Sequence, residues 1–387
     1  MNEMLVLVFS SFTLGQIALI ISVLATRAPT IQAYWSLVGL FCALACLVMQ
    51  PIVHQFYTEY EVYSLIIMLP ALLLLAPLLW FYVEGMTSQT SWKMRAAKKR
   101  HLIYPAAGAA IAVATTFLPL QQLNILFTGN GSQMSTYMGF LMIVVFGLVI
   151  GWVFQSLFYL VAIVKRLAFY RKSLKQYFAN LESRDMLWLS VFAVLMIIIW
   201  LAAIVSVLLD NVFGIDVFDR QSATPMAFLL VWCLGFCVIA QRPGFEQAFI
   251  DTSEPDTDIA KQDKKYLRSA LDQRHSRRIA EKLETLVESE QLYLDADISL
   301  SRLASMSGIS AHYLSQTLNE TLGKNFFDYI NEKRIHHAKT QLQVFKKSVV
   351  DIAFDAGFNA RSSFYKAFKQ FTDQTPSQFR RDNCQES

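Results

Sequence analysis

Long apolar stretches fill the first 242 residues of the chain, and short amphipathic segments fill most of the remainder. Each apolar stretch approaches or exceeds the roughly 20 residues that a helix needs to cross a bilayer. There are seven: Met4–Ala25, Ala33–Val53, Val62–Val83, His101–Leu120, Tyr137–Val164, Met186–Leu209 and Thr224–Gln241. The pattern predicts a polytopic seven-helix membrane domain over residues 1–242.

The pattern changes after Arg242. Residues 243–275 are predicted to be a linker, because the stretch Asp251–Asp258 is acidic and poor in apolar residues. From about Ser276, apolar residues such as Ile279 and Leu283 recur at helical spacing, with no strand-like alternation. We therefore expect an all-α fold, with a soluble helical domain over residues 276–387.

Composition separates the two halves in the same way. The 387 residues are 54% hydrophobic and only 17% charged, which argues against both a soluble globular enzyme and a disordered chain. Up to Arg242 the chain holds 14 of its 34 Lys and Arg residues and 9 of its 30 Asp and Glu residues. The last 145 residues therefore have the charge content of an ordinary soluble domain.

The loops between the predicted spans differ sharply in positive charge. Those following spans one, three and five hold 12 Lys and Arg residues, whereas the alternate loops hold only Arg220. Short basic loops stay in the cytoplasm. The N-terminus is thus predicted to lie outside and the C-terminal domain inside, which requires an odd number of spans. The first span lacks a basic leading segment and a cleavage site, so we expect it to be retained.

The interiors of the spans contain few reactive groups. No Lys, Arg, Asp or Glu lies near the centre of a span, which argues against a pump or coupled transporter. Four cysteines form two i, i+4 pairs, Cys42 with Cys46 and Cys233 with Cys237. Their spacing leaves a redox or metal role open, but packing as small apolar residues is favoured. We predict no metal site and no cofactor.

An internal repeat marks the C-terminal domain. Ala304 and Gly308 recur 49 residues later as Ala353 and Gly357. In each copy a small residue allows two helices to approach, and a glycine supplies the positive φ of the turn between them. Ser310 and Asn359 are the predicted N-caps of the helices that follow. Each such helix has apolar anchors four residues apart, at Leu314, Leu318, Phe364 and Phe368. The repeat predicts two helix-turn-helix motifs.

The segment Asp351–Arg380, DIAFDAGFNARSSFYKAFKQFTDQTPSQFR, resembles the signature of AraC/XylS-type transcriptional regulators. Tyr313–Arg334 is similar to the first motif and connecting helix of that family. The resemblance covers about residues 276–381 and implies a bacterial transcription factor with two helix-turn-helix motifs in one chain. Asp373 departs from the family's usual glycine, and the seven-span unit replaces its usual soluble cupin-like domain.

The resemblance also implies which residues read DNA bases. Those positions are His312, Ser315, Gln316, Arg361, Ser362 and Lys366. Arginine pairs bidentately with guanine and glutamine with adenine. The alternative for each is a solvated helix face. Residues 324–381 hold 11 Lys and Arg against 5 Asp and Glu, whereas residues 261–323 hold nine of each. The second motif is therefore expected to supply more of the phosphate contacts.

These expectations predict a transcriptional regulator in the bacterial inner membrane that is not an enzyme. Its expected partners are double-stranded promoter DNA and the lipid bilayer, with RNA polymerase and a second copy of the chain as further candidates. A small-molecule or envelope signal at the membrane domain is expected to control it. The alternative is a membrane receptor or transporter-like protein with a regulatory DNA-binding tail.

Overall fold

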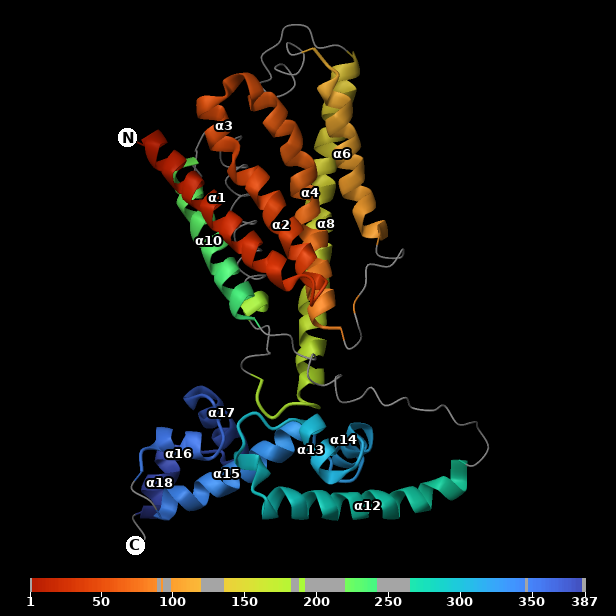
Figure 1. Cartoon of the computed structure of the whole chain (residues 1–387), viewed down its shortest axis with the longest axis vertical. Helices are drawn as coiled ribbons and strands as arrows, with labels where there is room; N and C mark the ends of the chain where they lie inside the picture. The colour runs from red at the N-terminus through yellow and green to blue at the C-terminus, as the bar shows by residue number, and fades with distance from the viewer. Residues whose placement is uncertain are drawn as a thin grey trace. The chain divides into compact units, whose positions relative to one another are not determined.

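The computed structural model describes residues 2–88, 92, 99–119, 136–181, 188–191, 220–241, 265–344 and 347–384. These residues are mostly helical, as predicted, and among them the only β-type pairing is an isolated bridge between Phe178 and Ser299. The chain divides into two compact units (Figure 1). The first comprises residues 1–168 and 186–241, and the second comprises residues 169–185 and 242–387.

The first unit consists of helices that follow the apolar stretches. They are α1 (Asn2–Arg27), α2 (Ala33–Val48), α3 (Gln50–Phe56), η1 (Thr58–Tyr60), α4 (Glu61–Met86), η2 (Arg100–Leu102), α6 (Ile103–Thr116), α8 (Thr136–Leu174) and α10 (Arg220–Ala240). The second stretch is interrupted at Met49, where α3 begins with a proline in its first turn. The stretch Ala33–Phe56 nevertheless remains one apolar segment of 24 residues.

Four segments of the described chain are long and apolar enough to cross a membrane: Glu3–Arg27, Ala33–Phe56, Glu61–Met86 and Thr136–Leu174. The apolar part of α10, Thr224–Ala240, is shorter. The helix α6 has 14 residues and ends at Thr116, three residues before Pro119. Of the sixth predicted span, only residues 188–191 are described. The count of seven spans therefore stays a prediction.

Small residues and one basic side chain bring the helices of the first unit together. A Cβ atom on Gly108 of α6 would lie 2.4 Å from a terminal methyl carbon of Leu73 on α4, so glycine favours the close approach of these helices. Arg27 at the end of α1 donates a hydrogen bond of 2.7 Å to the Ile239 carbonyl near the end of α10. Large side chains of α8, including Phe146 and Phe154, are about two-thirds exposed.

The second unit is built around the long helix α15 (Phe326–Val344). It also contains α12 (Lys265–Ser289), η3 (Leu292–Leu294), α13 (Leu300–Ser307), α14 (Ala311–Glu320), α16 (Val349–Asp355), α17 (Arg361–Thr372) and α18 (Pro376–Cys384). The start of α15 packs with α12, α13 and α14 around one apolar core, and its second half packs with α16, α17 and α18 around another. One helix thus belongs to both cores.

The first helix of the second unit is longer than the apolar periodicity indicated. It begins at Lys265, within the stretch 243–275 that the composition assigned to a linker. Residues 265–275 contain neither proline nor glycine, so nothing in the local sequence ends the helix there. Among residues 274–289 of α12, whose burial is described, the first buried apolar positions are Ile279 and Ala280, and Ile279 belongs to the core.

Candidate nucleic-acid interface

The first half of the candidate interface is the helix pair α13 and α14. Gly308 ends α13 with φ of +65°, the left-handed conformation that the sequence predicted there. Ser310 caps α14 by accepting a hydrogen bond from the Tyr313 amide at 3.4 Å, again as predicted. Leu314 and Leu318 are fully buried, so the opposite side of α14 is turned outward.

The second half is the helix pair α16 and α17. Gly357 has φ of +86°, and a Cβ atom there would lie 2.7 Å from the Leu294 carbonyl oxygen. The prediction that Asn359 caps α17 is wrong, because the N-cap is Ala360, which makes no side-chain capping bond. The turn of the second copy is one residue longer, which moves the helix start by one position. Phe364 and Phe368 are fully buried, as expected of the anchors.

The candidate base-reading residues of α14 are partly engaged with neighbours on the same helix. His312 is exposed, whereas Ser315 and Gln316 are half-buried. Gln316 donates a hydrogen bond to the Glu320 carboxylate at 3.0 Å, and the Ser315 carbonyl accepts one from the Asn319 side chain at 2.7 Å. If Gln316 reads a base, it must exchange a charge-assisted bond for the new one.

The corresponding residues of α17 are more accessible, because Arg361, Ser362 and Lys366 are all exposed. The Arg361 guanidinium lies 4.9 Å from the centre of the Tyr365 ring and donates to its hydroxyl at 3.4 Å. The Tyr365 hydroxyl also lies 3.5 Å from the Ser377 hydroxyl. This bond, together with the Arg361 charge, lowers the pKa of Tyr365, although partial burial opposes the shift.

Two aromatic residues beside the candidate contacts were not singled out from the sequence. Tyr365 supports Arg361, and Tyr313 is about half exposed next to His312, with ring centres 5.9 Å apart. The signal available in the sequence was the spacing of four residues between Arg361 and Tyr365, which places two side chains on one helix face. This spacing did not single out Tyr365, because most aromatic residues in this domain pack in its apolar cores.

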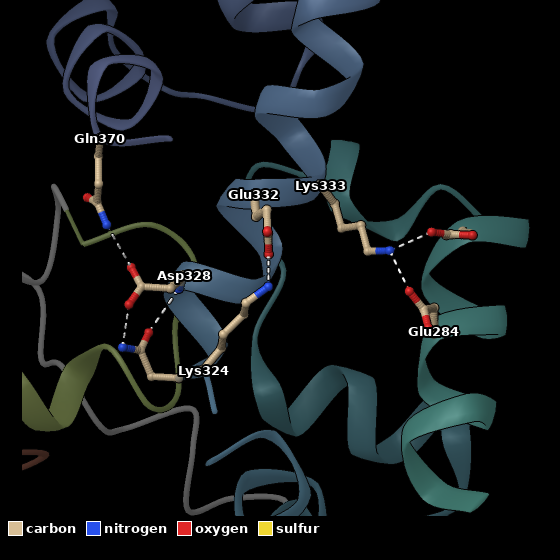
Figure 2. Close-up of polar contacts among 8 residues, drawn as sticks. Glu284, Lys324, Asp328, Glu332, Lys333 and Gln370 are labelled. Carbon is tan, nitrogen blue, oxygen red and sulfur yellow. Dashed lines mark hydrogen bonds and ion pairs between the residues drawn. The ribbon is translucent and has the colours of Figure 1, made fainter. Parts of the chain in front are cut away.

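Several basic residues of the second half are held by carboxylates or carbonyls. Lys347 forms an ion pair with Asp355 at 2.9 Å, and Arg380 donates to the Lys347 carbonyl at 2.8 Å. Figure 2 shows two more ion pairs that involve α15: Lys324, just before this helix, with Glu332, and Lys333 with Glu284 of α12. The excess positive charge counted from the sequence is therefore only partly available to phosphates. Its accessible part includes the exposed Arg361, Lys366 and Lys369 of α17.

A buried arginine joins the two halves. Arg334 on α15 is 1% exposed and donates to the Tyr293 carbonyl at 2.7 Å and to the Asp295 carbonyl at 2.8 Å. Its guanidinium also lies 5.4 Å from the ring centre of Phe358, which follows the Gly357 turn. Burial lowers the pKa of Arg334 to about 10, opposed by the charges of Asp295 and Asp297, so the side chain stays charged at neutral pH.

Side-chain contacts also link α17 to the start of α15. Gln370 donates to the Asp328 carboxylate at 3.5 Å, and Asp328 in turn accepts from the Asn325 side chain at 2.7 Å (Figure 2). At the same end of α17, Asp373 is the C-cap residue and adopts φ of +58°. Asp373 therefore adopts a left-handed conformation, which glycine adopts more readily, at the position where the sequence departs from the usual glycine.

Comparison with known proteins places this region in a known domain class. Residues 303–382 match the family model described as a helix-turn-helix domain. The chain is 38% identical over 102 residues to an uncharacterised HTH-type transcriptional regulator of Staphylococcus aureus strain COL. It is 32% identical over 103 residues to the HTH-type transcriptional regulator GlxA of Rhizobium meliloti. These matches cover 26% and 27% of this chain but only 14% and 30% of the relatives.

Two solved structures match a similar share of the chain, each with 30% identity. One is a Listeria innocua protein of unknown function, which matches over 26% of this chain and 93% of its own, with a TM-score of 0.24. The other is the C-terminal domain of the two-component response regulator yesN from Fusobacterium nucleatum. It matches over 27% of this chain and 98% of its own, with a TM-score of 0.25. The matches are thus confined to about a quarter of the chain.

Proposed function

We propose that this chain, whose residues 303–382 form a helix-turn-helix domain, is a membrane-embedded transcriptional regulator of the AraC/XylS type that binds promoter DNA sequence-specifically. One observation carries the proposal. Two helix pairs with matched glycine turns each bury one side of their second helix and turn its polar side outward. This is the arrangement in which a helix-turn-helix motif places a recognition helix in the major groove.

In this proposal α14 and α17 are the two recognition helices. His312, Ser315 and Gln316 of α14 and Arg361, Ser362 and Lys366 of α17 face the DNA. Arg361 and Gln316 have the chemistry for bidentate contacts with guanine and adenine. Both relatives named above are described as transcriptional regulators, which agrees with this assignment.

The membrane part of the proposal rests on the first unit. The outward-facing phenylalanines of α8 need an apolar solvent, and lipid provides one. The excess of Lys and Arg in alternate loops supports an external N-terminus and a cytoplasmic C-terminal domain. We propose that a small-molecule or envelope signal acts on this unit. A second copy of the chain and RNA polymerase are proposed partners of the DNA-bound state.

A selection from random DNA duplexes tests the proposal. The full chain is reconstituted in lipid nanodiscs, and the duplexes that it retains are sequenced after several rounds. We expect enriched sites with two short boxes whose centres lie about 10–10.5 base pairs apart, one for each recognition helix. The control variant Arg361→Ala with Gln316→Ala should enrich neither box. Recovery of random sequences by the unaltered chain would contradict the proposal.

A further inference from the structure

The end of α8 and the loop after it belong to the second unit, although they follow a predicted membrane span. The chain enters this unit at Phe169, and residues 169–181 pack within it. Phe178 and Ala179 are 1% and 2% exposed, and Ala179 is part of the core formed by α12, α13, α14 and the start of α15. We call residues 175–181 the docking segment.

Backbone carbonyls of the docking segment pair with amides at the starts of two helices. The Leu300 amide of α13 donates to the Tyr177 carbonyl at 2.8 Å, and the Phe327 amide of α15 donates to the Lys175 carbonyl at 2.9 Å. Amides in the first turn of a helix have no partner within the helix. The docking segment therefore supplies one acceptor to the first turn of each helix, and Figure 2 shows it in olive beside the start of α15.

Side chains extend the same contact toward the junction of the two helix pairs. The Lys175 ammonium lies 5.2 Å from the ring centre of Phe327. Asn331, which is 1% exposed, donates to the Ala179 carbonyl at 3.4 Å and accepts from the Arg334 guanidinium at 3.3 Å. Arg334 in turn holds the carbonyls of Tyr293 and Asp295, so a chain of hydrogen bonds connects the docking segment to the junction.

We propose that the docking segment is a second, non-covalent attachment of the DNA-binding domain to the membrane domain, and that it transmits the position of the end of α8 to the junction at Asn331 and Arg334. The first attachment is the polypeptide itself, through residues 242–264. Both the attachment and the transmission rest on the proposed membrane embedding, and the transmission also rests on the proposed DNA binding. A displacement of α8 that pulled on Lys175 would remove the bonds at the starts of α13 and α15.

Cutting the chain between the two domains, within residues 242–264, tests whether the docking segment alone can hold them together. A protease site is inserted at residues 251–258 of the full chain in nanodiscs, and the chain is then cut. We expect the C-terminal domain to remain with the nanodiscs, because the docking segment still holds it. Ala179→Asp should release it at least ten times faster, since it places a carboxylate in the apolar core. Gln176→Asp adds the same charge to the same segment at a half-buried position and should leave retention unchanged.

Phe327→Ala is a milder test that leaves the core intact. It removes the ring under Lys175 and should speed release about threefold, while the circular dichroism of the released domain keeps its helical signal. Rapid release of the domain from the unaltered chain would overturn the attachment. So would release that is unchanged by both Ala179→Asp and Phe327→Ala.

The uncut chains then test transmission through DNA affinity. We expect Ala179→Asp to change the Kd for a selected two-box site at least fivefold, and Gln176→Asp to leave it within twofold. If Ala179→Asp releases the domain after cleavage but leaves the Kd for DNA unchanged, the proposed transmission is wrong and the attachment still stands. Absence of DNA binding by the unaltered chain would count against the proposed function, and the retention result would still decide the attachment.

Discussion

At the residue scale, Arg361 is the candidate base-reading residue that the structure positions most clearly. The Tyr365 ring lies 4.9 Å away, and the two side chains also share a hydrogen bond of 3.4 Å. An arginine that is already held on an aromatic face loses less conformational freedom when it binds than one that moves freely in solvent. The tyrosine is therefore expected to support DNA binding without needing to contact a base.

Arg361→Ala should weaken binding to a selected DNA site by ~1–3 kcal/mol and relax the preference at one base pair. Tyr365→Phe keeps the ring and removes only the hydroxyl, so it should cost less than half as much and leave the base preference unchanged. The measurement is the affinity for the site and its single-base variants at fixed salt. Unchanged affinity and base preference in a folded Arg361→Ala protein would show that the register assigned to α17 is wrong.

At the scale of elements, the two glycine turns differ in how much space surrounds them. Both glycines have positive φ, but a Cβ atom on Gly308 would meet no atom within 4 Å, whereas one on Gly357 would overlap the carbonyls of Leu294 and Tyr293. The first turn therefore requires only the backbone freedom of glycine. The second also requires the absence of a side chain, because η3 passes directly over it.

Gly308→Ala should lower the free energy of unfolding by ~1 kcal/mol, the cost of a left-handed alanine. Gly357→Ala should lower it by ~3 kcal/mol or more, because steric overlap adds to that cost. Amide exchange in α15, which belongs to both cores, measures both changes. Equal losses for the two variants would mean that η3 moves away from the turn at little cost.

The contact between α12 and α15 predicts a dependence on pH. Lys333 donates to Glu284 at 2.8 Å and to Glu288 at 2.5 Å (Figure 2). Its hydrogen bond and its charge lower the pKa of Glu288 below the usual 4.5. A carboxyl whose pKa is lowered in the folded state stabilises that state above its unfolded pKa, and this contribution is lost as the pH falls through the folded value.

We therefore expect amides of α12 to exchange faster as the pH is lowered below 4.5, beyond the intrinsic change in exchange rate. Glu288→Gln cannot titrate, so the part of the change that is due to this carboxyl should disappear in that variant. Lys333→Met should also remove this part of the pH dependence, because the charge that lowers the pKa of Glu288 is gone. A pH profile that is identical in all three proteins would contradict the role of this contact.

At the scale of the whole molecule, the distribution of Lys and Arg among the loops predicts the orientation in the membrane. Alkaline phosphatase fused after Arg242 should be inactive, because that position is expected in the cytoplasm, where the enzyme does not fold to its active form. The same reporter inserted between Gln121 and Thr136 should be active. The opposite pattern would reverse the proposed topology and place the C-terminal domain away from DNA.

The sequence alone determined the features that depend on residues close together in the chain. Apolar stretches predicted the long helices α1, α4 and α8, because a helix that is apolar on all sides is evident from composition. The repeat located both turns, since Gly308 and Gly357 adopt the positive φ that only glycine reaches without strain. It also identified the buried anchors of α14 and α17, which lie one helical turn apart.

The tertiary structure decided the features that depend on contacts between distant residues. No local pattern indicates that Arg334 is buried, because its carbonyl partners lie about 40 positions earlier in the chain. The contact between Ala179 and Asn331 spans 152 positions. The sequence placed residues 175–181 in the basic loop between the fifth and sixth predicted spans. It did not indicate their burial, because burial depends on which distant residues pack against them. Their packing in the core of the second unit emerged only when the chain was folded.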